Sequence, residues 1–255
     1  MKLVPKVVIC GMMFYMLILL SCSYLPENVH VDSRLTYNET PDYIALELKE
    51  NEADITLMFL PGGLVDPHAY LSLMQRIALD SINIVIPKFT SNLAIFELSK
   101  YESLLDVFPD AGSLYIAGHS LGGIAALSAV SKSPDEFDGL ILLGTYPSES
   151  FAISDWDRSV LSLYAENDSL STPQEVLGAS SFLPEACMIS DVSEIDSVEL
   201  LSPKTFYYQI SGGNHAQFGD YGAQEGDGVA TISVEEQHEQ VSSAIIKFVR
   251  HNENY

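Results

Sequence analysis

The sequence predicts an α/β fold in which a mostly parallel sheet carries helices on both faces. Short apolar runs alternate with helix-like runs, and the connections between them are short. The apolar runs contain few polar positions, which is typical of strands buried on both faces. A length of 255 residues suits one catalytic domain of this class. We expect that domain to span residues 43–255.

The expected strands begin with Tyr43–Leu48, the first clear apolar run after a polar segment. The others are Ile55–Leu60, Ile82–Pro87, Ser113–Gly118, Leu140–Gly144, Val160–Ala165 and Phe206–Ile210.

The expected helices are marked by their first residues. Asp66 and Pro67 form a cap and a first helical position before a helix over Ala69–Leu79. Capping boxes begin at Thr172 and Ser233, each with a glutamate three residues later. In the last helix the apolar residues recur at helical spacing, which predicts one face against the sheet: Val241, Ala244, Ile245 and Phe248.

The first residues indicate export. Two lysines precede an apolar run over Val7–Leu20, which is shorter than the ~20 residues that a spanning helix needs. The run ends in Leu19-Leu20-Ser21-Cys22, which resembles the lipobox of bacterial lipoproteins. We therefore expect a signal peptide over 1–21, a lipid on Cys22 that anchors the chain to a membrane of the cell envelope, and a polar tether over 22–42. An uncleaved anchor and an ordinary signal peptide are the alternatives.

The charge and the cysteines exclude several classes of function. A net charge of −23 repels polyanions, so nucleic-acid binding and purely electrostatic adhesion to anionic lipid are disfavoured. After cleavage Cys22 and Cys187 would remain, and a lipid on the first leaves the second without a partner. The sequence contains no cysteine and histidine cluster with metal-ligand spacing, and we expect no metal and no organic cofactor.

A candidate nucleophile lies in Gly118-His119-Ser120-Leu121-Gly122, at the end of an apolar strand and the start of a small-residue helix. A serine hydroxyl becomes a useful nucleophile when a sharp turn holds it beside a base and an oxyanion hole. The alternative is that Ser120 only caps the helix. The flanking glycines favour the nucleophile.

An acid and a histidine follow two later strands. Asp168 comes just after Val160–Ala165, and His215 follows Phe206–Ile210 in a Gly-Gly-Asn-His loop. Catalytic side chains gather at such carboxyl ends, where His215 would move the proton of Ser120 and Asp168 would orient its ring. Three other acids are alternatives for Asp168: Glu166, Asp191 and Asp196. The other histidines are expected to be incidental: His30, His68, His119, His238 and His251.

The oxyanion hole needs two converging backbone N–H groups. Leu121, directly after the nucleophile, supplies one. Gly63, in the Pro-Gly-Gly loop after Ile55–Leu60, is our choice for the second, with Leu64 as the fallback. A plain tight turn is the alternative interpretation of the two glycines.

Four segments together carry a resemblance to a known family: Phe59–Pro67, Asn92–Phe96, Gly118–Gly123 and Gly212–Gly222. From about Tyr43 to Phe248 the chain resembles the compact bacterial α/β-hydrolases often grouped with the dienelactone hydrolases. The resemblance implies a carboxylic ester hydrolase with a serine triad and no cofactor. Dienelactone hydrolases themselves use cysteine. The acidic stretch over 187–204 is an insertion relative to this family, and we expect a surface loop there unless it borders the site.

The expected reaction is transfer of an acyl group from an ester to water. The connection between Gly144 and Val160 is too short for a large lid, which predicts an open site for small esters or for acyl groups displayed on a larger molecule. A thioesterase, lactonase or peptidase would use the same residues. A binding lipoprotein that kept the fold and lost the chemistry is the alternative from another class.

Overall fold

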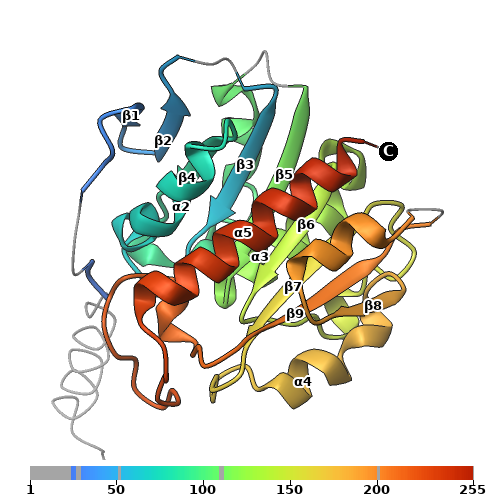
Figure 1. Cartoon of the computed structure of the whole chain (residues 1–255). Coiled ribbons are helices and arrows are strands. Elements are labelled where there is room, and N and C mark those ends of the chain that lie inside the picture. Colours follow the sequence, from blue (N-terminus) through green and yellow to red (C-terminus); the bar gives the residue numbers. More distant parts are fainter. Residues whose placement is uncertain (1–23, 27–29, 51–52, 109–111, 200–201, 255) are drawn as a thin grey trace, which may run out of the picture.

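The computed structural model describes residues 24–26, 30–50, 53–108, 112–199 and 202–254 (Figure 1). The predicted signal peptide over 1–21 and the predicted lipid site Cys22 lie outside these residues.

A single sheet of nine strands forms the centre of the described part of the chain, in the order β1-β2-β4-β3-β5-β6-β7-β9-β8. The pairs β1 with β2 and β2 with β4 are antiparallel, and the other neighbours are parallel. The strands are β1 Leu35–Glu39, β2 Tyr43–Leu48, β3 Ile55–Leu60, β4 Asn83–Pro87, β5 Ser113–His119, β6 Gly139–Leu143, β7 Val160–Ala165, β8 Ala186–Ile189 and β9 Thr205–Ile210.

Helices cover both faces of this sheet. α2 (Leu71–Ala78) and α5 (Val234–Asn252) pack on one face, and α3 (Leu121–Lys132) and α4 (Pro173–Gly178) pack on the other. Figure 1 shows α5 passing in front of the central strands. Along β3 the buried residues alternate between the two cores, so Phe59 lies with α2 and α5 and Met58 with α3. The predicted α/β architecture is confirmed.

Short 3₁₀ helices make up much of the connecting chain. They are η1 Pro67–Tyr70, η2 Thr90–Asn92, η3 Ala94–Phe96, η4 Lys100–Val107, η5 Pro134–Glu136, η6 Glu149–Phe151, η7 Ser180–Phe182, η8 Val192–Ser197 and η9 Ala216–Phe218. Between β6 and β7 the chain forms only η6, so this connection carries no inserted domain.

Both predicted capping boxes are present. The hydroxyl of Thr172 accepts the N–H of Glu175 at the start of α4, and that of Ser233 accepts the N–H of Glu236 at the start of α5. Asp66 caps η1, the short helix that leads into α2. These side chains satisfy N–H groups that have no partner within the helix.

Part of the predicted tether over 22–42 is instead a strand. β1 occupies 35–39 and pairs along its length with β2. Only Leu35 of this strand is buried, because β1 is at the edge of the sheet and forms through backbone pairing. Tyr24 also makes a parallel bridge to Val65, so the chain contacts the domain well before residue 43.

The acidic stretch over 187–204 also contains regular structure. β8 pairs in parallel with β9 and forms the other edge of the sheet, and η8 packs against α5. The expected surface loop is therefore wrong for 187–189 and 192–197. The acidic residues around it hid this four-residue strand, and only Ile189 of β8 is buried.

Candidate active site

The turn at Ser120 joins β5 to α3 in a strained conformation. Its φ of 54° and ψ of −121° are unusual for a residue with a side chain and cost of order 1–3 kcal/mol. The Ser120 N–H donates to the carbonyl of Leu143 at 3.0 Å, which ties the turn to β6. A Cβ on Gly122 would lie 2.1 Å from the carbonyl oxygen of Leu60, so only glycine allows this close approach.

His215 and Asp168 form a buried pair at the carboxyl ends of β9 and β7. Nδ1 of His215 lies 2.7 Å from Oδ2 of Asp168, and the two residues are 1% and 3% exposed. The other carboxylate oxygen, Oδ1, accepts the N–H groups of Leu170 at 2.8 Å and Ser171 at 2.7 Å. Three hydrogen bonds therefore fix the carboxylate, which can hold one tautomer of the imidazole.

The turn after β6 connects this pair to Ser120. A Cβ on Gly144 would lie 3.1 Å from Nδ1 of His215 and 3.2 Å from Oδ2 of Asp168. The residue before it, Leu143, accepts the N–H of Ser120. The ring of His119, the neighbour of Ser120, lies 4.5 Å from the ring of His215. The structure thus brings the predicted serine, histidine and acid to one edge of the sheet.

The three alternative acids have other contacts. Glu166 accepts the N–H of Gly212 at 2.8 Å. Asp191 caps η8, and Asp196 forms an ion pair with Lys247. Asp168 is the acid that contacts His215.

The two predicted oxyanion donors lie beside each other. A Cβ on Gly63 would be 2.5 Å from Cδ1 of Leu121, so the loop after β3 runs directly past the first residue of α3. The N–H of Leu64, the fallback donor, is used in a hydrogen bond to the carbonyl of Asn92 at 2.8 Å. This favours Gly63 over Leu64.

A buried contact that the sequence did not predict lies behind this loop. The hydroxyl of Tyr70 accepts the N–H of Gly62 at 2.9 Å and lies 2.8 Å from Nδ1 of His119. His119, which we expected to be incidental, is 1% exposed. Burial, and then the proximity of His215, lower the pKa of His119 well below its usual value, although the backbone of His215 opposes this effect. His119 therefore stays neutral.

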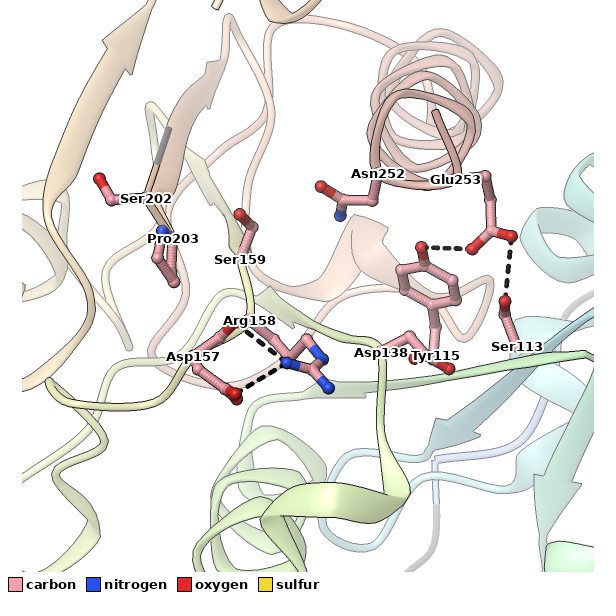
Figure 2. A pocket seen from close by; sticks show the side chains of 10 residues that line it. All are labelled: Ser113, Tyr115, Asp138, Asp157, Arg158, Ser159, Ser202, Pro203, Asn252 and Glu253. Carbon is pink, nitrogen blue, oxygen red and sulfur yellow. Dashed lines mark hydrogen bonds and ion pairs between the residues drawn. The ribbon is translucent and has the colours of Figure 1, made fainter. Parts of the chain in front are cut away.

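A hollow of about 500 Å³ lies at the opposite ends of the strands (Figure 2). It is bordered by residues at the starts of β5 and β7 and by the end of α5, and there Glu253 accepts hydrogen bonds from Ser113 and Tyr115. Ser120 lies at the other end of β5. This hollow therefore does not serve the candidate site.

The described residues show neither a membrane-spanning helix nor a metal-binding cluster. No helix there has the length and apolar character to cross a bilayer. No group of three or more His, Cys, Asp or Glu side chains there could hold a metal ion.

The parallel sheet, the strained serine turn and the buried histidine–aspartate pair are features typical of hydrolases with α/β architecture. The chain matches the model of the alpha/beta hydrolase family over residues 56–196 and 188–239. It belongs to the alpha/beta hydrolase family, and this membership supports hydrolase activity. A search of curated protein sequences finds no match.

Two solved structures share the fold. A predicted CIB-like hydrolase from Thermoplasma acidophilum is 12% identical with a TM-score of 0.56, and the match covers 85% of this chain and 99% of that one. Est1E from Butyrivibrio proteoclasticus is 12% identical with a TM-score of 0.57, and the match covers 88% of this chain and 100% of that one. At this identity the likeness concerns the fold alone.

Proposed function

We propose that this protein hydrolyses carboxylic esters through an acyl-enzyme on Ser120. The observation that carries the proposal is the strained Ser120 turn beside the hydrogen-bonded pair of His215 and Asp168. Backbone strain at a serine is retained where the surrounding structure fixes it, and such positions cluster at functional sites.

In the proposed first step, Oγ of Ser120 attacks the ester carbonyl carbon while His215 accepts the hydroxyl proton. The N–H groups of Leu121 and Gly63 stabilise the resulting oxyanion. Asp168 accepts a hydrogen bond from Nδ1 of His215 and stabilises the imidazolium. The tetrahedral intermediate then collapses, and His215 gives its proton to the leaving alcohol.

In the second step, His215 removes a proton from water, and the hydroxide attacks the acyl carbon. Collapse of this second intermediate releases the carboxylic acid and returns the proton to Ser120. No metal or organic cofactor enters the scheme.

The proposed substrates are esters of short acyl groups, free or displayed on a larger molecule. Support comes from the short connection between β6 and β7, which forms only η6. Leu121, at the first turn of α3, is 39% exposed, as expected beside an open site. A preference for emulsified long-chain triglyceride over p-nitrophenyl butyrate would contradict an open site.

The direct experiment is labelling of the purified protein with a fluorophosphonate probe, which reacts with an activated serine. Wild type should label and Ser120→Ala should not, while Ser128→Ala, a buried serine within α3, serves as the matched control. An unlabelled wild type overturns the proposal. A panel of butyrate esters, thioesters, lactones and peptides then separates ester hydrolysis from the other reactions of the same residues.

We also propose that the chain is exported and anchored through a lipid on Cys22. The support is the sequence Leu19-Leu20-Ser21-Cys22 after an apolar run. Metabolic labelling with a fatty acid should mark the wild type and not Cys22→Ala. Equal labelling of both would contradict the anchor.

A further inference from the structure

Among the described residues, most of the exposed large apolar side chains lie at the edge of the sheet that carries the candidate site. In the described part of the chain, eight large apolar residues are exposed. Two lie on edge strands, Tyr37 on β1 and Met188 on β8. The other six lie in loops or first turns at the carboxyl edge of the sheet, and we call them the apolar rim: Leu25, Ile95, Phe96, Leu121, Leu170 and Val229.

Sequence adjacency and two contacts connect parts of the apolar rim to the site itself. Leu121 directly follows Ser120. The N–H of Leu170 donates to Asp168. η3, which carries Ile95 and Phe96, packs against α3. The carbonyl of Asn92, just before η3, accepts the N–H of Leu64. The rim therefore begins on the elements that form the site.

Val229 belongs to the same edge. The backbone of its neighbour Gly228 passes so close to Asn167 that a Cβ on Gly228 would lie 1.9 Å from the Asn167 carbonyl oxygen. Asp227 accepts the N–H of Ala216, the residue after His215. Val229 is 85% exposed and Phe96 is 73% exposed. Single exposed apolar residues are ordinary, but a cluster of them around a site indicates a contact surface.

The N-terminal chain arrives at this same edge. The N–H of Tyr24 donates to Leu64 at 2.7 Å, and its carbonyl accepts the N–H of Asp66 at 2.9 Å. The Tyr24 ring also packs on Tyr221 with centroids 5.2 Å apart. Figure 1 shows this short dark-blue segment beside the orange loop between β9 and α5. The residue after Tyr24, Leu25, belongs to the apolar rim.

The sequence before Tyr24 identifies what covers the apolar rim. Cys22 is two residues before Tyr24 and the apolar run Val7–Leu20 ends four residues before it, so extended chain spans at most about 7 Å and about 14 Å respectively. A membrane attachment through either feature therefore holds the rim close to the bilayer. The net charge of −23 disfavours attraction to anionic lipid, which favours an apolar contact over an electrostatic one.

We infer that the apolar rim rests on the surface of a zwitterionic lipid bilayer, and that the ester cleaved at Ser120 has its alcohol part held in that bilayer. The second half of this inference rests on the proposed function. The exposed rim side chains enter the headgroup region around the site. Ser120 then faces esters presented at the membrane surface.

Fluorescence quenching tests the docking without any activity. The full chain contains one tryptophan, Trp156, which is buried and gives a constant background. Phe96→Trp adds a reporter in the rim, and Met188→Trp adds one at an exposed apolar position of β8. In phosphatidylcholine vesicles with brominated acyl chains, the Phe96→Trp emission should be quenched and the Met188→Trp emission should not. Equal quenching of the two, or none, overturns the docking.

A matched pair of butyrate esters tests the substrate class. Hexadecyl butyrate in phosphatidylcholine vesicles and p-nitrophenyl butyrate in water share the acyl group and differ in presentation. The double variant Phe96→Ser/Val229→Ser should lose at least about tenfold of its rate on the vesicle ester, because two apolar contacts with lipid are removed. Its rate on the soluble ester, and both rates of Met188→Ser, should stay unchanged.

The outcomes separate the two proposals. If wild type cleaves neither ester but shows the quenching difference, the proposed function fails and the docking stands. If the double variant loses both rates equally, the rim lines the substrate pocket and the inference is overturned. If the rim is covered by a second copy, light scattering will show a dimer that Phe96→Ser dissociates, lipid will quench neither reporter, and the inference is again overturned.

Discussion

The hydroxyl oxygen of Tyr70 lies 2.8 Å from Nδ1 of His119, and it also accepts the N–H of Gly62. One buried hydroxyl thus joins the loop that carries Gly63 to the residue before Ser120. The two parts of the proposed oxyanion hole, which come from different strands, are held together at this atom. His119 in turn packs against the ring of His215.

Tyr70→Phe is expected to lower activity more than its effect on stability would suggest. The change leaves the Gly62 N–H without a buried partner, which costs about 1–3 kcal/mol of unfolding free energy. It also frees the oxyanion loop, and a displacement of about 1 Å there can reduce kcat by about 100-fold. Urea unfolding and steady-state kinetics measure the two effects.

The matched control is Tyr101→Phe. Tyr101 is also buried, and its hydroxyl lies 3.0 Å from Oγ of Ser133, on the α3 side of the sheet and away from Ser120. This variant should lose stability and keep its kcat. Equal losses of kcat in both variants would show that Tyr70 acts only through general stability.

Asp168→Asn tests the choice among the four acids. An amide cannot stabilise the imidazolium and favours the wrong tautomer of His215, and the corresponding change in a serine triad lowers kcat about 10⁴-fold. Glu166→Gln and the exposed Asp191→Asn should keep most of the activity. A larger loss in Glu166→Gln than in Asp168→Asn, measured as kcat on p-nitrophenyl butyrate, would reassign the acid.

Gly144→Ala should damage the site, although Gly144 has no side chain and so makes no side-chain hydrogen bond to it. The backbone there has a φ of +53°, and the added methyl group would press on both His215 and Asp168. The left-handed conformation alone costs about 1–2 kcal/mol for alanine. We expect a lower melting temperature together with a marked fall in kcat.

Gly178→Ala provides the comparison for that variant. Gly178 is in α4, and a Cβ there would meet nothing within 4 Å. Alanine in place of glycine in a helix should stabilise the protein by about 0.5–1 kcal/mol and leave kcat unchanged. If Gly144→Ala keeps full activity, the turn after β6 does not position the histidine–aspartate pair.

The sequence predicts the parallel core of the sheet because its strands are mostly apolar, as in β3 and β6, which are buried at every position. It does not predict β1, where a single buried residue, Leu35, gives no pattern. The positions of Ser120, Asp168 and His215 follow from their places after strands. The contact of Tyr70 with His119 joins residues 49 positions apart and leaves no local pattern, so it emerges only when η1 and β5 pack together.

Buried histidines also escaped the sequence interpretation. His238 lies in a polar stretch of α5 and was expected to be incidental, yet it is 1% exposed. Its Nδ1 is 3.1 Å from Oγ of Ser72, because α5 packs on α2. Burial lowers the pKa of His238 from 6.5 to about 4, with a smaller contribution from the charge of Arg76.

The depressed pKa of His238 predicts acid destabilisation. Between pH 6.5 and about 4 the unfolded chain binds a proton that the folded chain does not, so the free energy of unfolding falls as the pH is lowered through this range. A shift of this size corresponds to about 3 kcal/mol at the acid limit. His119, whose pKa is also lowered by burial, adds a loss of the same sign. Urea unfolding at pH 7, 5 and 4 measures the total, and in His238→Asn the loss between pH 7 and 4 should be smaller. Acid losses of equal size in the variant and the wild type would mean that His238 can be protonated without unfolding, as it could be if α5 moves away from α2 at low pH.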